Sequence, residues 1–226
     1  MKKLIFIIVS VVMTAGSVSA QNIFFAHKEG MKLFYAYLNA KGKIDNYSLL
    51  TIKNVEGSGD NMTISYVSQI VDKNRKPAGN NPVEVPYTIT INNGMLEWDM
   101  KIFAAPGTEG LVTCEGDKLR IPSSLAPGTK LDDVTFTLTL NMGIRIRTQI
   151  SITEQECLGI EDITVPAGTF NCYKVTQTSA ATIGRSKPAI TKSIYWYSPG
   201  IGTVKYETYN AKNQLQSAME LHALDN

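Results

Sequence analysis

The sequence predicts an all-β protein built from antiparallel strands. Apolar and polar residues alternate along most of the chain, which places the apolar side chains on one face of each strand. Helical spacing of apolar residues is nearly absent. The segments between the alternating runs are rich in Gly, Asn and Pro, as strand connections require.

The clearest strands form a hairpin. In 134–140 the apolar positions fall on one side and the threonines on the other, and the alternation resumes over 144–152 after the turn at 141–143. One face of this hairpin is therefore expected to be dry and the other wet. The same reasoning predicts further strands at Lys32–Leu38, Tyr47–Val55, Met62–Val71, Val85–Ile91, Met95–Ile102, Leu111–Thr113, Lys118–Ile121, Gly159–Val165, Thr169–Thr178, Ile190–Tyr197, Thr203–Tyr209 and Leu215–Leu221.

One turn motif occurs twice and recurs once in a looser form. Asn39–Ile44 and Asn210–Leu215 share the order Asn-Ala-Lys-(Gly or Asn), and 72–76 is the looser version. Gly42 and Asn213 fall where a hairpin turn needs a positive φ, which Gly and Asn tolerate. The motif predicts repeated hairpin chemistry and not a solenoid, because no repeat of 20–50 residues is sustained.

The N-terminus has the pattern of a secretory signal peptide. Met1-Lys2-Lys3 precedes a ten-residue apolar run and a small-residue segment that ends at Ala20. Cleavage between Ala20 and Gln21 is expected, because the apolar run is too short to span a bilayer, which takes about 20 residues. No Cys lies near this site, so we expect a soluble periplasmic or secreted protein and not a lipoprotein, with no transmembrane segment in the mature chain.

The charge balance argues against nucleic acid as a partner. The chain has 22 Lys and Arg against 20 Asp and Glu, and two of the lysines lie in the first 20 residues, so the mature chain is neutral. A nucleic-acid-binding protein would normally present a basic face. The mature chain of residues 21–226 is long enough for one β domain with a real core. The stretch 103–131 is rich in Pro and Gly, so a division of this domain into two lobes that meet there stays possible.

Three cysteines remain in the mature chain, Cys114, Cys157 and Cys172. An exported protein can oxidise a pair, but the odd number leaves at least one thiol free or bonded to another chain. A simple hairpin turn centred on Ala167 would place Cys172 opposite Asp162 and Cys157 opposite Gln177. A bulge or an intervening bend near Gly159 could change this register and allow a Cys157–Cys172 disulfide, and buried free thiols are the alternative.

No set of residues predicts catalysis, and no metal or cofactor site is expected. His27 and His222 lie near opposite ends of the mature chain, and there is no Gly-x-Ser-x-Gly motif to hold a nucleophile. The acidic pairs 132–133 and 161–162 are the only carboxylates that suggest glycoside hydrolysis, and such pairs also keep the edges of a sheet soluble. We expect the protein not to be an enzyme.

Several segments resemble the TapB-like family of exported bacterial β-proteins of unknown function. The resemblance rests on Ile121–Leu125, Pro127–Asp133, Val165–Lys174 and Trp196–Lys205, with a weaker match at Trp98–Met100. It covers about half of the mature chain. It implies a curved antiparallel sheet or incomplete β-barrel, a half-barrel similar in outline to LolA and the lipocalins. It implies no catalytic residues.

Two non-enzymatic functions follow as hypotheses. A curved sheet with an apolar concave face can hold a lipid or another hydrophobic small molecule. Trp98, Phe136, Phe170 and Trp196 are candidates to line such a face, although each can equally fill an ordinary core. The alternative is a structural module of the cell envelope that holds a protein partner with its sheet faces or edges.

Overall fold

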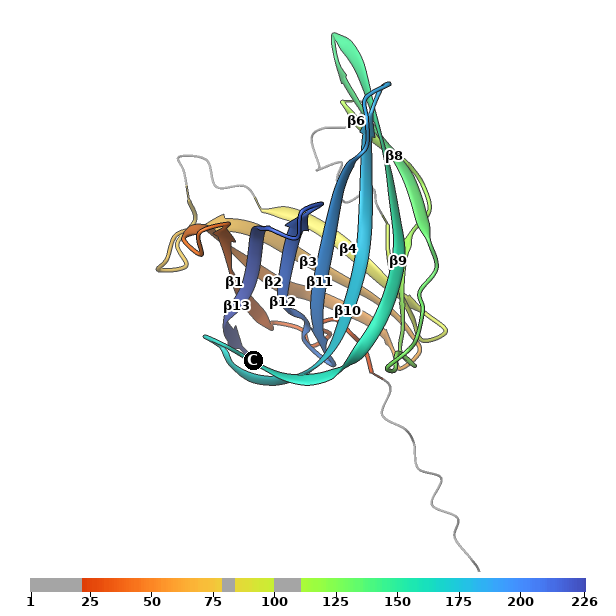
Figure 1. The fold of residues 1–226 in the computed structure, drawn as a ribbon. Coiled ribbons are helices and arrows are strands. Elements are labelled where there is room, and N and C mark those ends of the chain that lie inside the picture. Colours follow the sequence, from red (N-terminus) through yellow and green to blue (C-terminus); the bar gives the residue numbers. More distant parts are fainter. Residues whose placement is uncertain (1–21, 79–83, 100–110) are drawn as a thin grey trace, which may run out of the picture.

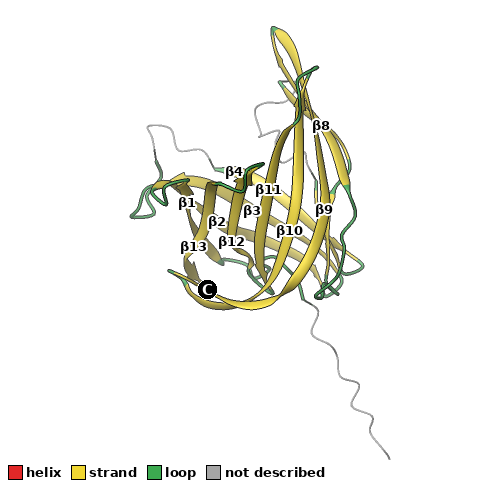
Figure 2. Cartoon of the chain, viewed as in Figure 1, coloured by secondary structure: helices red, strands yellow, loops and turns green. Residues whose placement is uncertain are grey.

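The fold is one curved antiparallel sheet. The structure is a computed structural model that describes residues 22–78, 84–99 and 111–226. Its thirteen strands are β1 (Lys32–Asn39), β2 (Ile44–Ser58), β3 (Asn61–Val71), β4 (Val85–Asn92), β5 (Met95–Trp98), β6 (Val112–Gly116), β7 (Leu119–Pro122), β8 (Val134–Met142), β9 (Ile144–Val165), β10 (Gly168–Ile183), β11 (Ala189–Ser198), β12 (Gly202–Asn210) and β13 (Leu215–Asp225). Figures 1 and 2 show them curling around a common interior, and no described residue is helical. The all-β prediction is confirmed.

The strand order explains why the sheet curves but does not close. The order is β6-β8-β9-β10-β11-β12-β13-β1-β2-β3-β4-β5-β7, with every described pairing antiparallel. The two edge strands, β6 and β7, are joined only by Asp117 and Lys118. This short link forces the edges near each other, yet no ladder joins them among the described strands.

Gly116 makes the bend between the two edges. Its φ is +134°, and a Cβ there would lie 2.5 Å from the carbonyl oxygen of Thr135. Only glycine fits this approach without displacing backbone. The bend is held by two bonds to β8, in which Asp117 N donates to Thr135 O and Thr135 N donates to Asp117 Oδ2, both at 2.9 Å.

Two of the predicted strands are a single long one. The segments 144–152 and 159–165 are both part of β9, which runs for 22 residues. The intervening residues stay in the ladder because two bulges absorb the irregularity, at Glu154 (φ +54°) and at Leu158. Figure 1 shows that the β9–β10 pair bends strongly, and the end of β9 contacts β12 and β13.

The register at the cysteines differs by one residue from the prediction. The β9–β10 turn is the two-residue link Pro166–Ala167, with Val165 opposite Gly168, so its centre lies before Ala167. Cys172 therefore faces Glu161, and the bulge at Leu158 then sets Cys157 opposite Val175. All three cysteines are buried, and no disulfide joins Cys157 to Cys172. A Cys157–Cys172 disulfide stays a prediction that this register does not favour.

The recurring turn motif is confirmed in all three copies. The Oδ1 atom of Asn39 accepts from the backbone N of Lys41 and Lys43, and Asn210 Oδ1 accepts from the equivalent positions 212 and 214. Asp72 does the same for residues 74 and 76. The fourth residue of each copy has a positive φ, as predicted for Gly42 and Asn213, and Arg75 shares it at +63°.

Three of the sequence predictions fall on residues outside the described ranges. The signal peptide, with cleavage between Ala20 and Gln21, is one of them. The second part of the strand predicted at Met95–Ile102 is another, since β5 ends at Trp98 and residues 100–110 are not described. The third is part of the stretch 103–131, where the sequence does not decide between one lobe and two. Every described strand belongs to the same sheet.

Candidate functional site

The concave face of the sheet changes from apolar to polar along each strand. Cross-strand partners share a face, so the inward-facing residues can be followed from strand to strand. We give them strand by strand, from the end with the β11–β12 turn toward the end with the β1–β2 and β12–β13 turns. They are Leu33, Tyr35 and Tyr37 on β1; Ile52, Leu50 and Ser48 on β2; Ile64, Tyr66 and Ser68 on β3; Tyr197, Tyr195 and Ser193 on β11; Val204, Tyr206 and Thr208 on β12; and Leu221, Met219 and Ser217 on β13. On each of these strands taken singly, the order runs from the core to a hydroxyl-bearing side chain. The ladders set Ser193, Thr208 and Ser217 side by side, whereas Ser48 pairs with Tyr35 and Ser68 with Leu50.

The apolar end of this gradient is the core of the protein. Five of its aliphatic side chains, those of Leu33, Ile52, Ile64, Val204 and Leu221, are at most 1% exposed. The N-terminal segment lies across them, with Phe24 and Ala26 also at 1%. Phe24 packs edge-on against Tyr173 with ring centroids 5.0 Å apart, and Gly200 N donates to Ile23 O at 2.7 Å. The segment that precedes β1 thus forms a floor inside the curved sheet.

The middle of the gradient is a group of tyrosines. Burial raises the pKa of Tyr35, Tyr66, Tyr195 and Tyr197 well above the ordinary value for a phenol. These hydroxyls therefore stay neutral at any physiological pH and act as hydrogen-bond donors and acceptors. Tyr195 stacks between Tyr197 and Tyr206, with centroid distances of 5.5 and 5.0 Å.

The polar end is a row of side-chain hydroxyls. Thr208 Oγ1 and Ser217 Oγ lie 2.7 Å apart, and Ser48 Oγ donates to Tyr37 Oη at 3.3 Å. Ser48 and Ser193 are only 3% and 4% exposed, so these hydroxyls belong to the inner wall and not to the outer surface. Uncharged hydroxyls can bond a polar group of either hydrogen-bonding character without the cost of burying a charge.

A half-open cavity of about 360 Å³ lies between the floor and this polar end. Its walls include Tyr35, Tyr37, Tyr66, Tyr87, Trp98 and Met219, and its floor includes Phe25 and Ala26. Phe25 packs against Tyr66 and Trp98, with centroids 5.1 and 6.1 Å away. An apolar hollow with a few convergent polar groups is the usual form of a small-molecule site.

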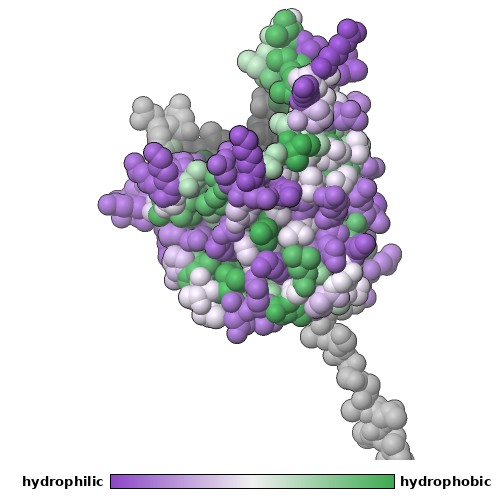
Figure 3. Space-filling view, in the orientation of Figure 1, coloured by the Kyte–Doolittle hydropathy of each residue, from purple (hydrophilic) through white to green (hydrophobic). Residues whose placement is uncertain are grey.

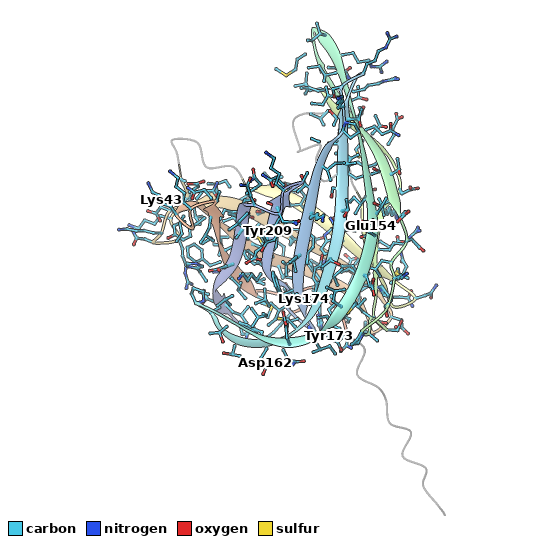
Figure 4. The ribbon with its side chains drawn as sticks, viewed as in Figure 1. Lys43, Glu154, Asp162, Tyr173, Lys174 and Tyr209 are labelled. Atoms are coloured by element: carbon cyan, nitrogen blue, oxygen red, sulfur yellow. The ribbon has the colours of Figure 1, made fainter. Side chains whose placement is uncertain are left out.

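A second hollow, of about 420 Å³, lies over β10–β12. Glu154 and Tyr209 border it (Figure 4), and Thr178 Oγ1 donates to Glu154 Oε2 at 2.7 Å. The Tyr209 hydroxyl donates to Glu207 at 2.5 Å, which raises the pKa of Tyr209 to about 12. Most of the lining of this hollow is polar, with Thr176, Gln177, Thr178, Lys192, Ser193 and Asn213 beside Glu154 and Tyr209. We therefore take the tyrosine-lined cavity as the candidate site.

Of the four aromatic residues predicted to line a concave face, the structure places one in the cavity wall. Trp98 lines the cavity, whereas Phe136 belongs to a smaller cluster with Cys114, Val134 and Ile152. Phe170 is half-buried at the β9–β10 turn and packs against the main core.

Trp196 faces away from the tyrosines, as the alternation in Tyr195-Trp196-Tyr197 predicts. Its indole Nε1 donates to Glu161 Oε1 at 2.6 Å, and the ammonium groups of Lys174 and Lys205 lie over its ring at 5.5 and 5.3 Å. The hydrogen bond from the indole, followed by Lys174 Nζ at 3.2 Å from Glu161 Oε1, holds the pKa of Glu161 below its ordinary value.

The residues weighed for catalysis lie apart. His27 makes a contact of 3.0 Å from Nδ1 to Phe25 O, and His222 packs edge-on against Phe34 and Tyr47. Asp162 Oδ1 accepts a hydrogen bond from Asn171 Nδ2. In the loop before β8, the backbone carbonyl of Asp132 accepts a hydrogen bond from the side chain of Gln155. Within the described ranges, no three His, Cys, Asp or Glu side chains are grouped so as to hold a metal ion. None of these residues lines the tyrosine cavity.

Solved structures with the same fold come from two bacteria. A protein from Bacteroides fragilis NCTC 9343, described as exported and as having a YmcC-like fold, is 24% identical, with a TM-score of 0.69 over 91% of this chain and 100% of its own. A protein from Parabacteroides distasonis ATCC 8503, described as a lipoprotein, is also 24% identical, with a TM-score of 0.72 over 90% of this chain and 99% of its own. At this identity the likeness concerns the fold.

Two further findings concern sequence relatives and membrane segments. No protein with a curated description matches the sequence. In the described part of the chain, no helix has the length and hydropathy needed to cross a membrane. The model of the DUF3108-like family matches residues 28–221, from just before β1 into β13. The narrower resemblance to the TapB-like family stays a prediction, and the matched length shows that the chain belongs to the DUF3108-like family.

Proposed function

We propose that this protein is an exported, non-enzymatic binding protein that holds one hydrophobic molecule with a polar end, such as a lipid, in the tyrosine-lined cavity. The observation that supports this most is the polarity gradient that repeats on six strands of the concave face. The hydroxyls of β11, β12 and β13 lie side by side at the end away from the core, and Ser48 and Ser68 bring two further hydroxyls into the cavity wall.

The gradient also suggests how the ligand is oriented. Its apolar part would lie against Phe25, Leu50 and Met219, where burial of apolar surface contributes about 25 cal/mol per Å². Its polar end would reach Ser48, Ser68 and the hydroxyl of Tyr37. The cavity of about 360 Å³ takes one small molecule or part of one acyl chain.

Native mass spectrometry of the protein purified from the cell that exports it is the first experiment. A co-purifying lipid, or a bound fluorescent fatty acid that unlabelled lipid displaces, is expected. Recovery without a small molecule and without binding of the probe would overturn the proposal. Capture of a specific envelope protein in its place would support the alternative of a protein-interaction module.

A pair of variants on β3 assigns the binding to the cavity. Ser68 lines the cavity, whereas Ser65 lies on the opposite face of the same strand, since odd spacing reverses the face. Ser68→Phe fills part of the cavity and should weaken binding of the fatty acid at least tenfold, about 1.4 kcal/mol. Ser65→Phe is the matched control and should leave binding unchanged. Equal affinities in the two variants would place the ligand elsewhere.

A further inference from the structure

The ends of two hairpins project beyond the rest of the sheet. We call them the finger, which comprises residues 139–150 of the β8–β9 hairpin and 180–192 of the β10–β11 hairpin. Figure 1 shows both reaching past the ends of β12 and β13, with the β8–β9 turn furthest out. The two hairpins are joined along β9 and β10 as far as Thr148 opposite Ile183, and Gly184 N donates to Arg147 O. The finger is therefore a continuation of the sheet and not a loose loop.

Large apolar side chains are exposed on the finger. Met142 and Ile144 face each other across the β8–β9 turn, and each is 68% exposed, while Ile183 is 56% exposed. Ile146 and Ile150 continue the same face toward the interior, because they follow Ile144 at even spacing. This is the face predicted to be dry, and it is dry only near the body of the sheet. Figure 3 shows hydrophobic residues gathered at this tip.

The charges of the finger all have one sign. Its five charged residues are Arg145, Arg147, Arg185, Lys187 and Lys192, and no Asp or Glu occurs in 134–153 or in 178–206. None of the five forms an ion pair with a residue that the structure describes. The chain as a whole has a net charge of only +2, so the finger is a local concentration of positive charge.

We propose that the finger docks on the surface of an anionic lipid bilayer. Exposed apolar side chains beside arginine and lysine are what an interfacial membrane anchor needs, because the first enter the acyl boundary while the second bind lipid phosphates. A second copy of this chain is disfavoured as the occupant, since the two fingers would bring ten positive charges together. Lys192, at the base of the finger, borders the polar hollow over β10–β12.

Co-sedimentation with vesicles tests this proposal on the protein purified after export. Vesicles of phosphatidylcholine with one quarter phosphatidylglycerol are expected to bind it, and vesicles of phosphatidylcholine alone much less. Each basic side chain near an anionic surface is worth about a fivefold change in partition, so Arg145→Gln with Arg147→Gln should lower it about 25-fold. Met142→Ser with Ile144→Ser should lower it at least tenfold. Raising the salt concentration should weaken the charge contribution.

Matched variants away from the finger serve as controls. Leu158 and Ile160 are 53% and 44% exposed on the same strand, β9, and follow Ile144 by 14 and 16 residues. Leu158→Ser with Ile160→Ser should bind vesicles like the wild type, as should Lys28→Gln with Lys32→Gln, whose lysines are exposed. Ser68→Phe should also bind them, because docking does not depend on the cavity.

Three outcomes would overturn the proposal. The first is the absence of binding to the anionic vesicles. The second is binding that the finger variants leave unchanged. The third is a dimer in solution that Met142→Ser with Ile144→Ser dissolves, in a protein that does not bind vesicles. Urea midpoints equal to the wild type confirm that the variants are folded.

Discussion

Replacing Phe24 by Ala tests whether the N-terminal segment is part of the folded core. The ring is 1% exposed and packs against Tyr173 and Tyr197, with centroids 5.0 and 6.4 Å away. Its removal from the core costs about 2–3 kcal/mol of transfer free energy, and the edge-to-face contacts add about 1 kcal/mol. We therefore expect the free energy of unfolding to fall by about 3–4 kcal/mol, within the usual range for Phe→Ala.

Equilibrium unfolding in urea, followed by tryptophan fluorescence, measures this loss. The dependence on urea concentration should stay the same, because the surface exposed on unfolding hardly changes. Phe170→Ala is the matched control, since Phe170 is only half-buried at the β9–β10 turn, and its loss should be clearly smaller. A fall of less than about 1 kcal/mol for Phe24→Ala would refute the reasoning, because it would mean that the segment can leave the sheet with little cost.

Three other predictions concern stability. Gly116→Ala should lower the free energy of unfolding by at least 2 kcal/mol in urea titrations, because its φ is +134° and the new Cβ would meet the backbone of β8; an unchanged midpoint would contradict this. Hydrogen bonds from Lys118 and Arg120 hold the pKa of Glu97 below its ordinary value. The free energy of unfolding should therefore fall as the pH drops through about 4.5. Glu97→Gln should remove that pH dependence and lower the free energy of unfolding by about 1 kcal/mol at pH 7. Burial lowers the pKa of His222, so its protonation costs stability as the pH falls through about 6.5. His222→Gln should make the melting temperature depend less on pH between pH 7 and 5. An unchanged pH dependence of the melting temperature would exclude His222 as its cause.

The strands and turns were predictable because they depend on local chemistry. Alternation alone located every described strand, and the Asn-Ala-Lys motif located positive φ values at Gly42 and Asn213, because a short turn leaves few backbone conformations. The length of β9 was not predictable in the same way. Its bulges at Glu154 and Leu158 break the alternation, and the ladder with β10 holds the strand together across them.

The candidate site was predictable only in kind. The two tryptophans, Phe136 and Phe170 were expected on the concave face, yet only Trp98 of the four lines the cavity, while tyrosines form most of its aromatic wall. The signal was present in Tyr35-Ala36-Tyr37, where alternation puts both tyrosines on one face. It could not be used without the strand order, because alternation gives two faces and does not say which one is concave.

The sequence by itself determined the all-β class, the strand positions, the hairpin turns and the concentration of basic and apolar residues in 139–150 and 180–192. Each of these follows from side-chain type and spacing within a few neighbouring residues. The tertiary structure decided that the edges β6 and β7 approach each other, that residues 22–26 form a floor, and that β11, β12 and β13 align their hydroxyls at one end. The physical reason is that pairing between distant strands sets curvature and register, and neither is encoded within one strand.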